Sequence, residues 1–222
     1  MKILINAGPT RESIDPVRFI TNHSTGKMGY ALARAAVAAG HDVTLVSGPV
    51  ALTPPDGLAR FVQVVTSAEM AEAMKQAFPE SELTILCAAV ADYRPKFYSG
   101  SKLKKQDGSL MLELERTEDI ALTLGQLKRP GQLLAGFAAE TEDVGPNALK
   151  KLKSKNFDWI AANRVGIPGS GFGSDTNIVQ LYAADGSMTD LGSGLKTELA
   201  ERLIRIFTAE KQKRVKINEY EK

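Results

Sequence analysis

The sequence predicts an α/β fold with a doubly wound, mostly parallel sheet. Short apolar runs that end at glycine, proline or polar residues alternate with amphipathic stretches of helical spacing, which is the pattern of repeated strand–helix units. The chain has 222 residues, of which 43% are hydrophobic and 24% charged, and this composition suits a soluble protein with an ordinary core. Because the sequence contains no internal repeat or low-complexity segment, we expect a single domain over residues 1–222.

The first strand and the first helix are the most clearly defined elements. "KILINAG", residues 2–8, is an apolar run stopped by Gly-Pro, which predicts a buried strand. Residues 27–39 carry small and apolar side chains at helical spacing, and Gly40 favours a helix end at that point. The buried face of this helix is expected to consist of Met28, Ala31, Leu32, Ala35, Ala36 and Ala39. So many alanines would let the helix lie close to the sheet.

Two more strands and a second helix continue the alternation. "DVTLVSGP", residues 42–49, predicts the second strand, and "LTILCAAVAD", residues 83–92, the third. Between them Ser67 is expected to cap a helix that runs to about Phe78. The carboxyl end of the third strand is where an open parallel sheet binds ligands.

After the third strand the alternation is interrupted. Residues 102–116 have Asp107-Gly108 between polar and alternating segments, which predicts a β-hairpin. The fold is therefore expected to be Rossmann-like with a hairpin arm at about 97–116. Since a protruding β arm exposes strand edges, we expect the arm to be used for dimerisation.

The later elements return to the α/β pattern. The expected elements are a helix at 118–127, a strand at 132–141, a helix at 146–155, a strand at 158–163, a strand and turn from 177, and a C-terminal helix at about 195–213. The apolar face of that last helix would consist of Leu195, Leu199, Leu203, Ile206 and Phe207. "GIPGSGFGSDTN", residues 166–177, predicts a flexible loop able to close on a ligand.

Composition excludes several classes of protein. The net charge of +2 gives no indication of a nucleic-acid partner, and no apolar run is long enough to span a membrane. A single cysteine, Cys87, excludes an internal disulfide and favours a cytoplasmic location, and its apolar surroundings favour a buried, unreactive thiol. The chain shows no signal peptide, and the first strand follows Met1 directly, so no further N-terminal domain is expected.

A long polar segment separates the first strand from the first helix. "GPTRESIDPVRFITNHSTG" fills residues 8–26, whereas such a connection typically takes only about 2–6 residues. Backbone N–H groups around Ser24 to Gly29 would point along the helix axis, where the helix dipole favours an anion. Gly26 and Gly29 would leave room for a phosphate to approach the backbone. We expect an anion-binding loop, with a plain tight connection as the alternative.

Known nucleotide fingerprints do not fit this loop. A G-x-G-x-x-G motif is missing, and the Gly26-Lys27 pair is followed by Met28 in place of the Ser or Thr of a P-loop. The second strand ends in "SGP", where a dinucleotide-binding domain has an acidic residue. Tyr98 and Lys102 have the Tyr-x-x-x-Lys spacing of short-chain dehydrogenases, but Gly100 between them disfavours the helical turn that this pair needs. An NAD(P)-dependent reductase of Rossmann type remains the alternative enzyme.

Metal and hydrolase sites have no sequence signature. His23 and His41 are the only histidines and have no metal-ligand spacing, so the metal ligands stay unknown. A G-x-S-x-G elbow is also missing, which argues against a Ser–His–acid hydrolase.

Several motifs together resemble one enzyme family. They are "GPTRESIDPVRFITNHSTGKMG", "AAVADYRP" (88–95), "KLKK" (102–105), "GFAAET" (136–141) and "KSKNFDWIAAN" (153–163). In order and spacing they closely resemble the phosphopantothenate–cysteine ligases, also called phosphopantothenoylcysteine synthetases. In many bacteria this ligase domain is fused behind a flavin-dependent decarboxylase. The chain resembles a free-standing ligase, with a separate phosphopantothenoylcysteine decarboxylase as a possible partner.

The resemblance implies a two-step reaction in coenzyme A biosynthesis. The carboxylate of 4′-phosphopantothenate attacks a nucleoside triphosphate, CTP (or ATP), with Mg²⁺, to give an acyl-nucleotide (an acyl-CMP with CTP) and pyrophosphate. The amine of L-cysteine then displaces the nucleotide monophosphate. Lysines and Mg²⁺ would neutralise the phosphate charge, since phosphoryl chemistry depends mainly on positioning and electrostatics. The choice between CTP and ATP stays open, because no residue pattern reads the base.

The resemblance also implies roles for individual residues. Lys102 would stabilise the developing charge, Asn22 would orient the acyl-nucleotide, and Arg18 would reach across a dimer interface to the phosphopantothenate. The nucleotide-binding residues would be Ser24, Gly26, Gly29, Thr117, Glu118, Asp119, Ile120, Phe137, Lys151, Lys155 and Asn163. The substrate-binding residues would be Arg18, Asn22, Ala88, Ala89 and Asp92.

Each of these residues also has a purely structural interpretation. The lysines could be solvated surface charges, Phe137 a core aromatic, Asn22 a turn residue and Arg18 the partner of Asp15 in a salt bridge. A non-catalytic nucleotide-sensing module is the third functional hypothesis, against which Asn22 and Lys102 argue.

Overall fold

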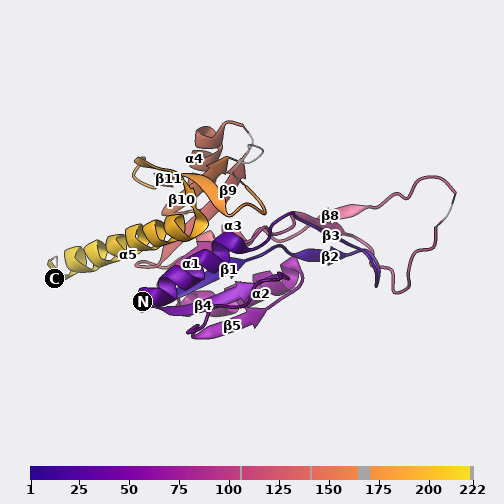
Figure 1. Cartoon of the computed structure of the whole chain (residues 1–222), viewed down its shortest axis with the longest axis horizontal. Helices are drawn as coiled ribbons and strands as arrows, with labels where there is room; N and C mark the ends of the chain where they lie inside the picture. The colour runs from indigo at the N-terminus through magenta and orange to yellow at the C-terminus, as the bar shows by residue number, and fades with distance from the viewer. Residues whose placement is uncertain (106, 141, 165–170, 221–222) are drawn as a thin grey trace.

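A computed structural model describes residues 1–105, 107–140, 142–164 and 171–220 of the chain. Over these residues the main sheet has eight strands in the order β12-β11-β10-β9-β6-β1-β4-β5 (Figure 1). Its strands are β1 (Lys2–Ala7), β4 (Asp42–Ser47), β5 (Arg60–Gln63), β6 (Leu83–Leu86), β9 (Leu133–Glu140), β10 (Trp159–Arg164), β11 (Thr176–Ala183) and β12 (Met188–Leu195). From β5 to β10 neighbouring strands are parallel, and β11 and β12 are antiparallel additions. The predicted doubly wound, mostly parallel α/β sheet is confirmed.

Helices cover both faces of this sheet. They are α1 (Lys27–Ala38), α2 (Ser67–Ala77), α3 (Ile120–Leu127), α4 (Val144–Ser154) and α5 (Lys196–Tyr220), and a 3₁₀ turn, η1 (Phe78–Glu80), follows α2. Helices α1 and α5 pack side by side on one face, and their core includes the Trp159 and Phe207 rings, whose centroids are 4.9 Å apart. Helices α2, α3 and α4 bury a second apolar cluster on the other face. Among the described residues, no helix combines the length and the apolar character that crossing a lipid bilayer requires.

The strand order reverses between β1 and β6. From β1 the chain moves to β4 and β5 on one side, and from β6 to β9 and β10 on the other. In an open parallel sheet this reversal leaves a crevice at the carboxyl ends of the two central strands, because their connections turn away in opposite directions. The fold therefore provides a ligand site where β1 meets α1 and β6 ends.

Helix α1 lies unusually close to β1. A Cβ atom at Gly29 would lie 2.5 Å from the Ala7 Cβ, so only glycine permits this approach. Gly29 thus has a packing role, whereas the sequence suggested that its missing side chain makes room for a phosphate. The predicted buried face of α1 is confirmed for four of its members, while Ala35 is half-buried and Ala39 is exposed.

Several predicted boundaries are wrong by local amounts. Helix α2 is capped by Thr66, which forms a capping box with Glu69, and Ser67 is its first residue. The third strand ends at Leu86, well before residue 92. The C-terminal helix continues past 213 to Tyr220, and Leu195 ends β12 with an exposed side chain. The strands β5 and β12 were not predicted.

Two short hairpins lie outside the main sheet. The first pairs β2 (Arg11–Ser13) with β3 (Phe19–Thr21) inside the long segment before α1, where no strand was predicted. The second pairs β7 (Tyr93–Pro95) with β8 (Leu114–Arg116). The expected ladder around Asp107-Gly108 is wrong, because the described residues between β7 and β8 form no strand and the pairing lies at the base. Figure 1 shows that this segment projects far from the sheet as an arm.

Candidate functional site

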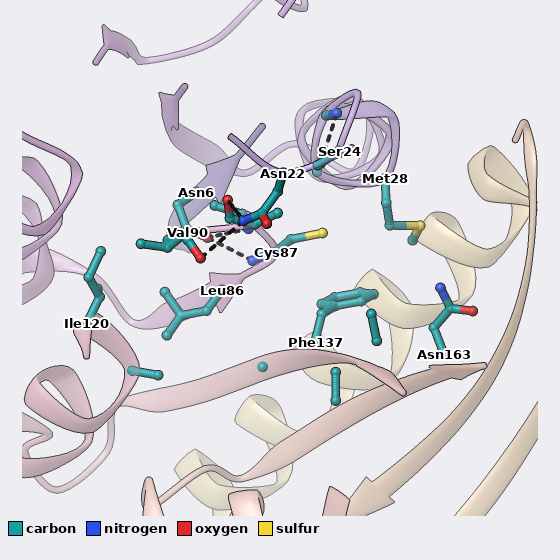
Figure 2. A pocket seen from close by; sticks show the side chains of 18 of the residues that line it. Asn6, Asn22, Ser24, Met28, Leu86, Cys87, Val90, Ile120, Phe137 and Asn163 are labelled. Carbon is teal, nitrogen blue, oxygen red and sulfur yellow. Dashed lines mark hydrogen bonds between the residues drawn. The ribbon is translucent and has the colours of Figure 1, made fainter. Parts of the chain in front are cut away.

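A cavity of about 460 Å³ lies at the carboxyl ends of β1, β6, β9 and β10, at the predicted crevice. Figure 2 shows Phe137 and Asn163 projecting from neighbouring strands into the same space as Asn22 and Met28. The predicted site residues that line it are Asn22, Ser24, Gly26, Gly29, Ala88, Ala89, Asp92, Glu118, Asp119, Ile120, Phe137, Lys151, Lys155 and Asn163. The fold thus brings together residues from most of the length of the chain.

Three predicted site residues do not line this cavity. Thr117 instead closes the base of the arm, since its hydroxyl donates to the Ala91 carbonyl at 2.6 Å and its amide to the Asp92 carbonyl at 3.0 Å. Arg18 lies in the turn between β2 and β3, and Lys102 is exposed on the arm. Within one chain, therefore, these two cations are not part of the cavity wall.

Helix α1 begins at the cavity without a side-chain cap. Gly26, its N-cap residue, has a left-handed backbone with φ of 76°, which glycine adopts without strain. The Gly26 amide donates to the Ser24 hydroxyl at 3.3 Å, and Lys27, Met28 and Gly29 of the first turn line the cavity. Because no side chain caps this helix end, the first backbone N–H groups of α1 can donate hydrogen bonds to an anionic ligand, and the helix dipole favours its negative charge.

Two asparagines shape the opposite wall, after β6. Asn6 is buried in β1, and its side-chain oxygen accepts hydrogen bonds from the amides of Cys87 at 2.7 Å and Ala88 at 2.9 Å (Figure 2). The Asn22 amide group donates to the carbonyls of Ala89 at 3.0 Å and Val90 at 3.3 Å. Both contacts fix the backbone of 87–90, where small side chains leave the main chain open to a ligand. Asn6 was missed because a polar residue in a buried strand has no motif.

The lysines of α4 form the cationic side of the cavity. Lys151 pairs with Glu140 at 2.6 Å, and Lys155 pairs with Asp119 at 3.0 Å. Asp119 also caps α3 by accepting from the Leu122 amide. Both ion pairs are partly exposed, so a polyphosphate could replace the carboxylates at little energetic cost.

Two further lysines line the cavity from the other face of the sheet. Lys27, at the start of α1, donates to the Asp175 carboxylate at 2.7 Å, and this contact lowers the pKa of Asp175. Lys196, at the start of α5, is buried and donates to the carbonyls of Gly171 and Ser174. Neither was predicted as a site residue, since a lysine at a helix start gives no signal beyond a solvated charge. The first part of the predicted flexible loop, residues 166–170, lies outside the described residues.

Cys87 lies in the cavity wall and is half-buried, so the prediction of a buried residue is wrong in this respect. Burial raises the pKa of its thiol to about 12, which keeps it protonated near neutral pH. The predicted lack of reactivity is consistent with this protonation, since the thiolate is the reactive form.

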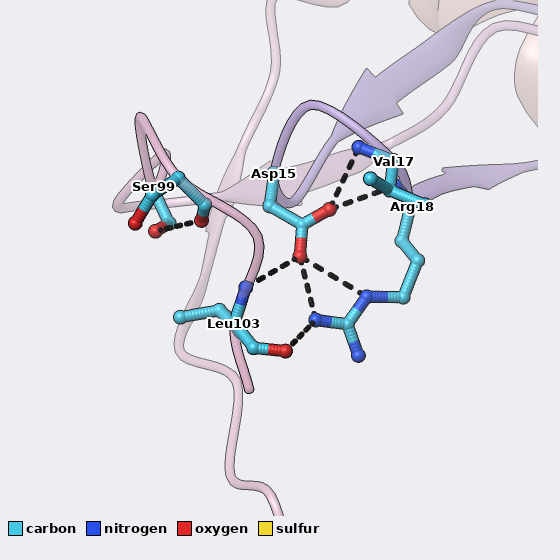
Figure 3. Close-up of polar contacts among 6 residues, drawn as sticks. Asp15, Val17, Arg18, Ser99 and Leu103 are labelled. Atoms are coloured by element: carbon cyan, nitrogen blue, oxygen red, sulfur yellow. Dashed lines mark hydrogen bonds and ion pairs between the residues drawn. The ribbon is translucent and has the colours of Figure 1, made fainter. Parts of the chain in front are cut away.

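Outside the cavity, Asp15 joins the first hairpin to the arm (Figure 3). Its buried carboxylate accepts from the Arg18 guanidinium at 2.5 Å and from the Leu103 amide at 3.1 Å. Arg18 also donates to the Leu103 carbonyl at 3.0 Å. The Arg18 guanidinium holds the pKa of the Asp15 carboxyl well below its usual range. The salt bridge between Arg18 and Asp15, which was the structural interpretation of Arg18, therefore forms within the chain.

The described residues contain no group of three or more His, Cys, Asp or Glu side chains that could hold a metal ion. Asp92 is an exposed carboxylate in the cavity wall, while Glu118 and Asp119 there pair with Lys75 and Lys155. This donor set suits Mg²⁺ that enters bound to phosphate oxygens and water.

Comparison with known proteins gives the family. The family model described as "DNA/pantothenate metabolism flavoprotein C-terminal domain" matches residues 1–210. The chain belongs to this family. It is 51% identical over 207 residues to the "Coenzyme A biosynthesis bifunctional protein CoaBC" of Bacillus subtilis (strain 168). The aligned region covers 93% of this chain and 51% of that protein. The chain spans about half the length of the curated relatives it matches.

Two solved structures have the same fold. The crystal structure of the C-terminal domain of a CoaBC protein is 46% identical, covers 92% of both chains and has a TM-score of 0.78. A Cab2 mutant in complex with phosphopantothenate-cysteine has a TM-score of 0.79 over 98% of this chain and 88% of its own, but only 17% identity, so it supports the fold alone.

Proposed function

We propose that the chain is a phosphopantothenate–cysteine ligase, which joins 4′-phosphopantothenate to L-cysteine at the expense of a nucleoside triphosphate. The observation that carries this proposal is the cavity itself. It combines an uncapped helix start, small residues after the end of β6 and lysines from three helices. Activation of a carboxylate by a polyphosphate needs this combination, because both reactants are anions.

In the first step the carboxylate of 4′-phosphopantothenate attacks the α-phosphorus of the nucleotide. A carboxylate oxygen–phosphorus bond forms and the bond to pyrophosphate breaks, which leaves an acyl-nucleotide. Lys151 and Lys155 would exchange Glu140 and Asp119 for phosphate oxygens, and the first-turn amides of α1 would hold the chain of phosphates. The nucleotide is proposed to be CTP bound with Mg²⁺, and ATP is the competing candidate.

In the second step the cysteine amine attacks the acyl carbonyl. A carbon–nitrogen bond forms and the nucleotide monophosphate leaves. Asn22 is proposed to orient the acyl-nucleotide from its position over the 89–90 backbone, and Ala88 and Ala89 would let the substrate approach that backbone closely. The product would be a substrate for a separate phosphopantothenoylcysteine decarboxylase.

A homodimer is part of the proposal. The arm exposes large apolar side chains, including Phe97 at 71% and Met111 at 87% exposure, and such surfaces favour association. Arg18 and Lys102 would then complete the cavity of the partner subunit. Each subunit of this dimer is proposed to be a single ligase domain, residues 1–222.

Pyrophosphate release tests the proposal directly. Purified protein with 4′-phosphopantothenate, L-cysteine, Mg²⁺ and CTP should release pyrophosphate, and omission of phosphopantothenate should abolish release. Parallel reactions with ATP identify the preferred nucleotide. A protein that releases no pyrophosphate with either nucleotide would refute the ligase assignment.

Two substitutions separate the proposed steps. Lys102→Gln should slow pyrophosphate release by at least tenfold, roughly the effect of one charged contact in the transition state. Asn22→Asp should still release pyrophosphate but accumulate acyl-nucleotide, detected by mass spectrometry of quenched reactions. An unchanged turnover of Lys102→Gln would remove the role given to Lys102, and normal turnover of Asn22→Asp would remove the role given to Asn22. A sensing module would instead bind the nucleotide and release no pyrophosphate.

The reductase alternative lacks structural support. Tyr98 and Lys102 lie on the arm, where the described residues form no helix, so the helical alignment that this pair needs is missing. At the end of β4, where a dinucleotide site needs an acidic side chain, Ser47 is buried and its hydroxyl donates to the Gly48 carbonyl.

A further inference from the structure

Lys196 is a buried cation in the wall of the cavity. Its relative exposure is only 7%, and its Nζ atom donates to the carbonyls of Gly171 at 2.9 Å and Ser174 at 2.5 Å. An ammonium group has three N–H donors, so these two bonds leave one donor for a further acceptor. Because the side chain lines the cavity, a ligand there is within its reach.

The charge of Lys196 has no direct counter-ion among the described side chains. The nearby carboxylate, Asp175, forms its ion pair with Lys27 at 2.7 Å. A buried charge normally has an ionic partner, since desolvation otherwise makes it strongly unfavourable. With no ionic partner among the described side chains, the Lys196 ammonium group is suited to bind an anionic ligand in the cavity.

The surroundings of Lys196 add to this imbalance. Burial lowers the pKa of Lys196 most, and the positive charge of Lys27 on α1 lowers it further, while Cys87 and Asp175 act in the opposite direction. Lys27 contacts the same short segment, donating to the Gly173 carbonyl at 2.9 Å. Two ammonium groups thus lie near each other beside the uncapped start of α1, an arrangement that an anion would stabilise.

We propose that Lys196 and Lys27 form a second phosphate-binding wall of the cavity, opposite Lys151 and Lys155. The first pair reaches the cavity from α1 and α5 on one face of the sheet, and the second pair from α4 on the other. The ligand is a phosphate group, from the polyphosphate of the nucleotide or from the phosphate ester of phosphopantothenate. This choice of sources depends on the proposed function, whereas the binding of phosphate does not.

Binding measurements without turnover test this inference. Titration calorimetry of the full chain with inorganic pyrophosphate, with CTP and with 4′-phosphopantothenate gives one affinity for each ligand. Lys196→Met and Lys27→Met should each weaken at least one of them by roughly tenfold or more, the loss expected for one charge-assisted contact. Lys153→Met, on the exposed side of α4, is the matched control and should bind like the wild type.

The pattern of losses identifies the source of the phosphate. Weaker binding of pyrophosphate and CTP assigns the wall to the polyphosphate, and weaker binding of phosphopantothenate alone assigns it to the phosphate ester. Lys27 is partly exposed, so Lys27→Met keeps the test open if Lys196→Met does not fold. Wild-type affinities for all three ligands in a folded Lys27→Met or Lys196→Met protein would overturn the inference. Failure of the ligase assay with intact phosphate binding would refute only the proposed function.

Discussion

A single side chain, Asn6, shapes the cavity wall at the carboxyl edge of the sheet. Its carboxamide oxygen accepts from two successive amides, Cys87 and Ala88, that would otherwise continue the β6 ladder. The strand therefore ends at Leu86, and the next residues turn their backbone toward the cavity. Two partly buried N–H groups would lose their acceptor in an Asn6 truncation, so the wall and the fold depend on the same contact.

Gly29 allows a direct test of the packing that positions α1. Gly29→Ala introduces a better helix former, yet its Cβ would lie 2.5 Å from the Ala7 Cβ and 3.1 Å from the Ala7 Cα. Since both atoms belong to Ala7 of the central strand β1, helix α1 must move away from the sheet. We expect a loss of about 1–3 kcal/mol in the free energy of unfolding, measured by urea denaturation, and weaker nucleotide binding.

Gly145→Ala is the matched control for this change. Gly145 also lies in a helix, but its new Cβ would approach only the Tyr182 side chain, with the hydroxyl oxygen nearest at 3.1 Å, and the tip of a side chain can turn aside. We expect the free energy of unfolding to stay within about 1 kcal/mol of the wild type. Equal stabilities of the two variants would contradict the close-packing role of Gly29.

For individual residues, the family motifs predicted the lining of the cavity better than local patterns of charge and polarity did. The motif residues of α4, β9 and the 88–92 segment meet at the cavity as expected. Lys196 and Asn6 were missed because their roles depend on contacts with residues far away in the chain. Asn6 and Cys87, for example, are 81 positions apart.

At the level of elements, the arm is attached to the body through Asp15. The Asp15 carboxylate accepts the Leu103 amide at 3.1 Å and is itself held by Arg18. Because the pKa of Asp15 is lowered while the arm is attached, the free energy that holds the arm has its full value above the ordinary aspartate pKa of about 4 and decreases progressively as the pH falls from there toward the lowered pKa. Protection of the Leu103 amide against hydrogen exchange should follow the same pH dependence.

Asp15→Asn should reproduce the acid effect at neutral pH. The amide removes the charge that binds Arg18, so the Leu103 amide should exchange faster and the arm should be cut sooner by trypsin. Asp107→Asn, an exposed residue of the same arm, changes the net charge equally and should leave both rates unchanged. Equal exchange of Leu103 in Asp15→Asn and wild-type protein would show that Asp15 does not anchor the arm.

Elements with strong local patterns were predictable, and those that depend on distant contacts were not. Strand β1 and helix α1 have apolar periodicity and clear stop residues, and both were located within about two residues. The hairpin of β2 and β3 was missed because its residues are mostly polar and its strands have only three residues each. The Asp107-Gly108 turn signal was misleading, since a turn sequence needs cross-strand packing to form a ladder.

For the whole molecule, the positions of Arg18 and Lys102 present the main question. Arg18 lies in the turn between β2 and β3 and contacts the arm, and Lys102 lies on the arm. Both are outside the cavity wall of their own chain, whereas Lys151 and Lys155 lie in that wall. In a twofold symmetric dimer the same surfaces meet twice, so an arm from each subunit can serve the cavity of the other. A shared site of this kind would make the activity depend on dimerisation.

Subunit mixing tests the shared site. Arg18→Ala removes the contribution to the partner, and Lys151→Met damages the cavity of its own subunit, so each variant alone should be nearly inactive. After subunit exchange at equal concentrations, about half of the dimers are mixed and each keeps one intact site, which restores about a quarter of the wild-type activity. A mixture of Lys151→Met and Lys155→Met should restore nothing, because every cavity remains damaged. If the first mixture is also inactive although exchange has occurred, Arg18 acts within its own chain and the site is not shared.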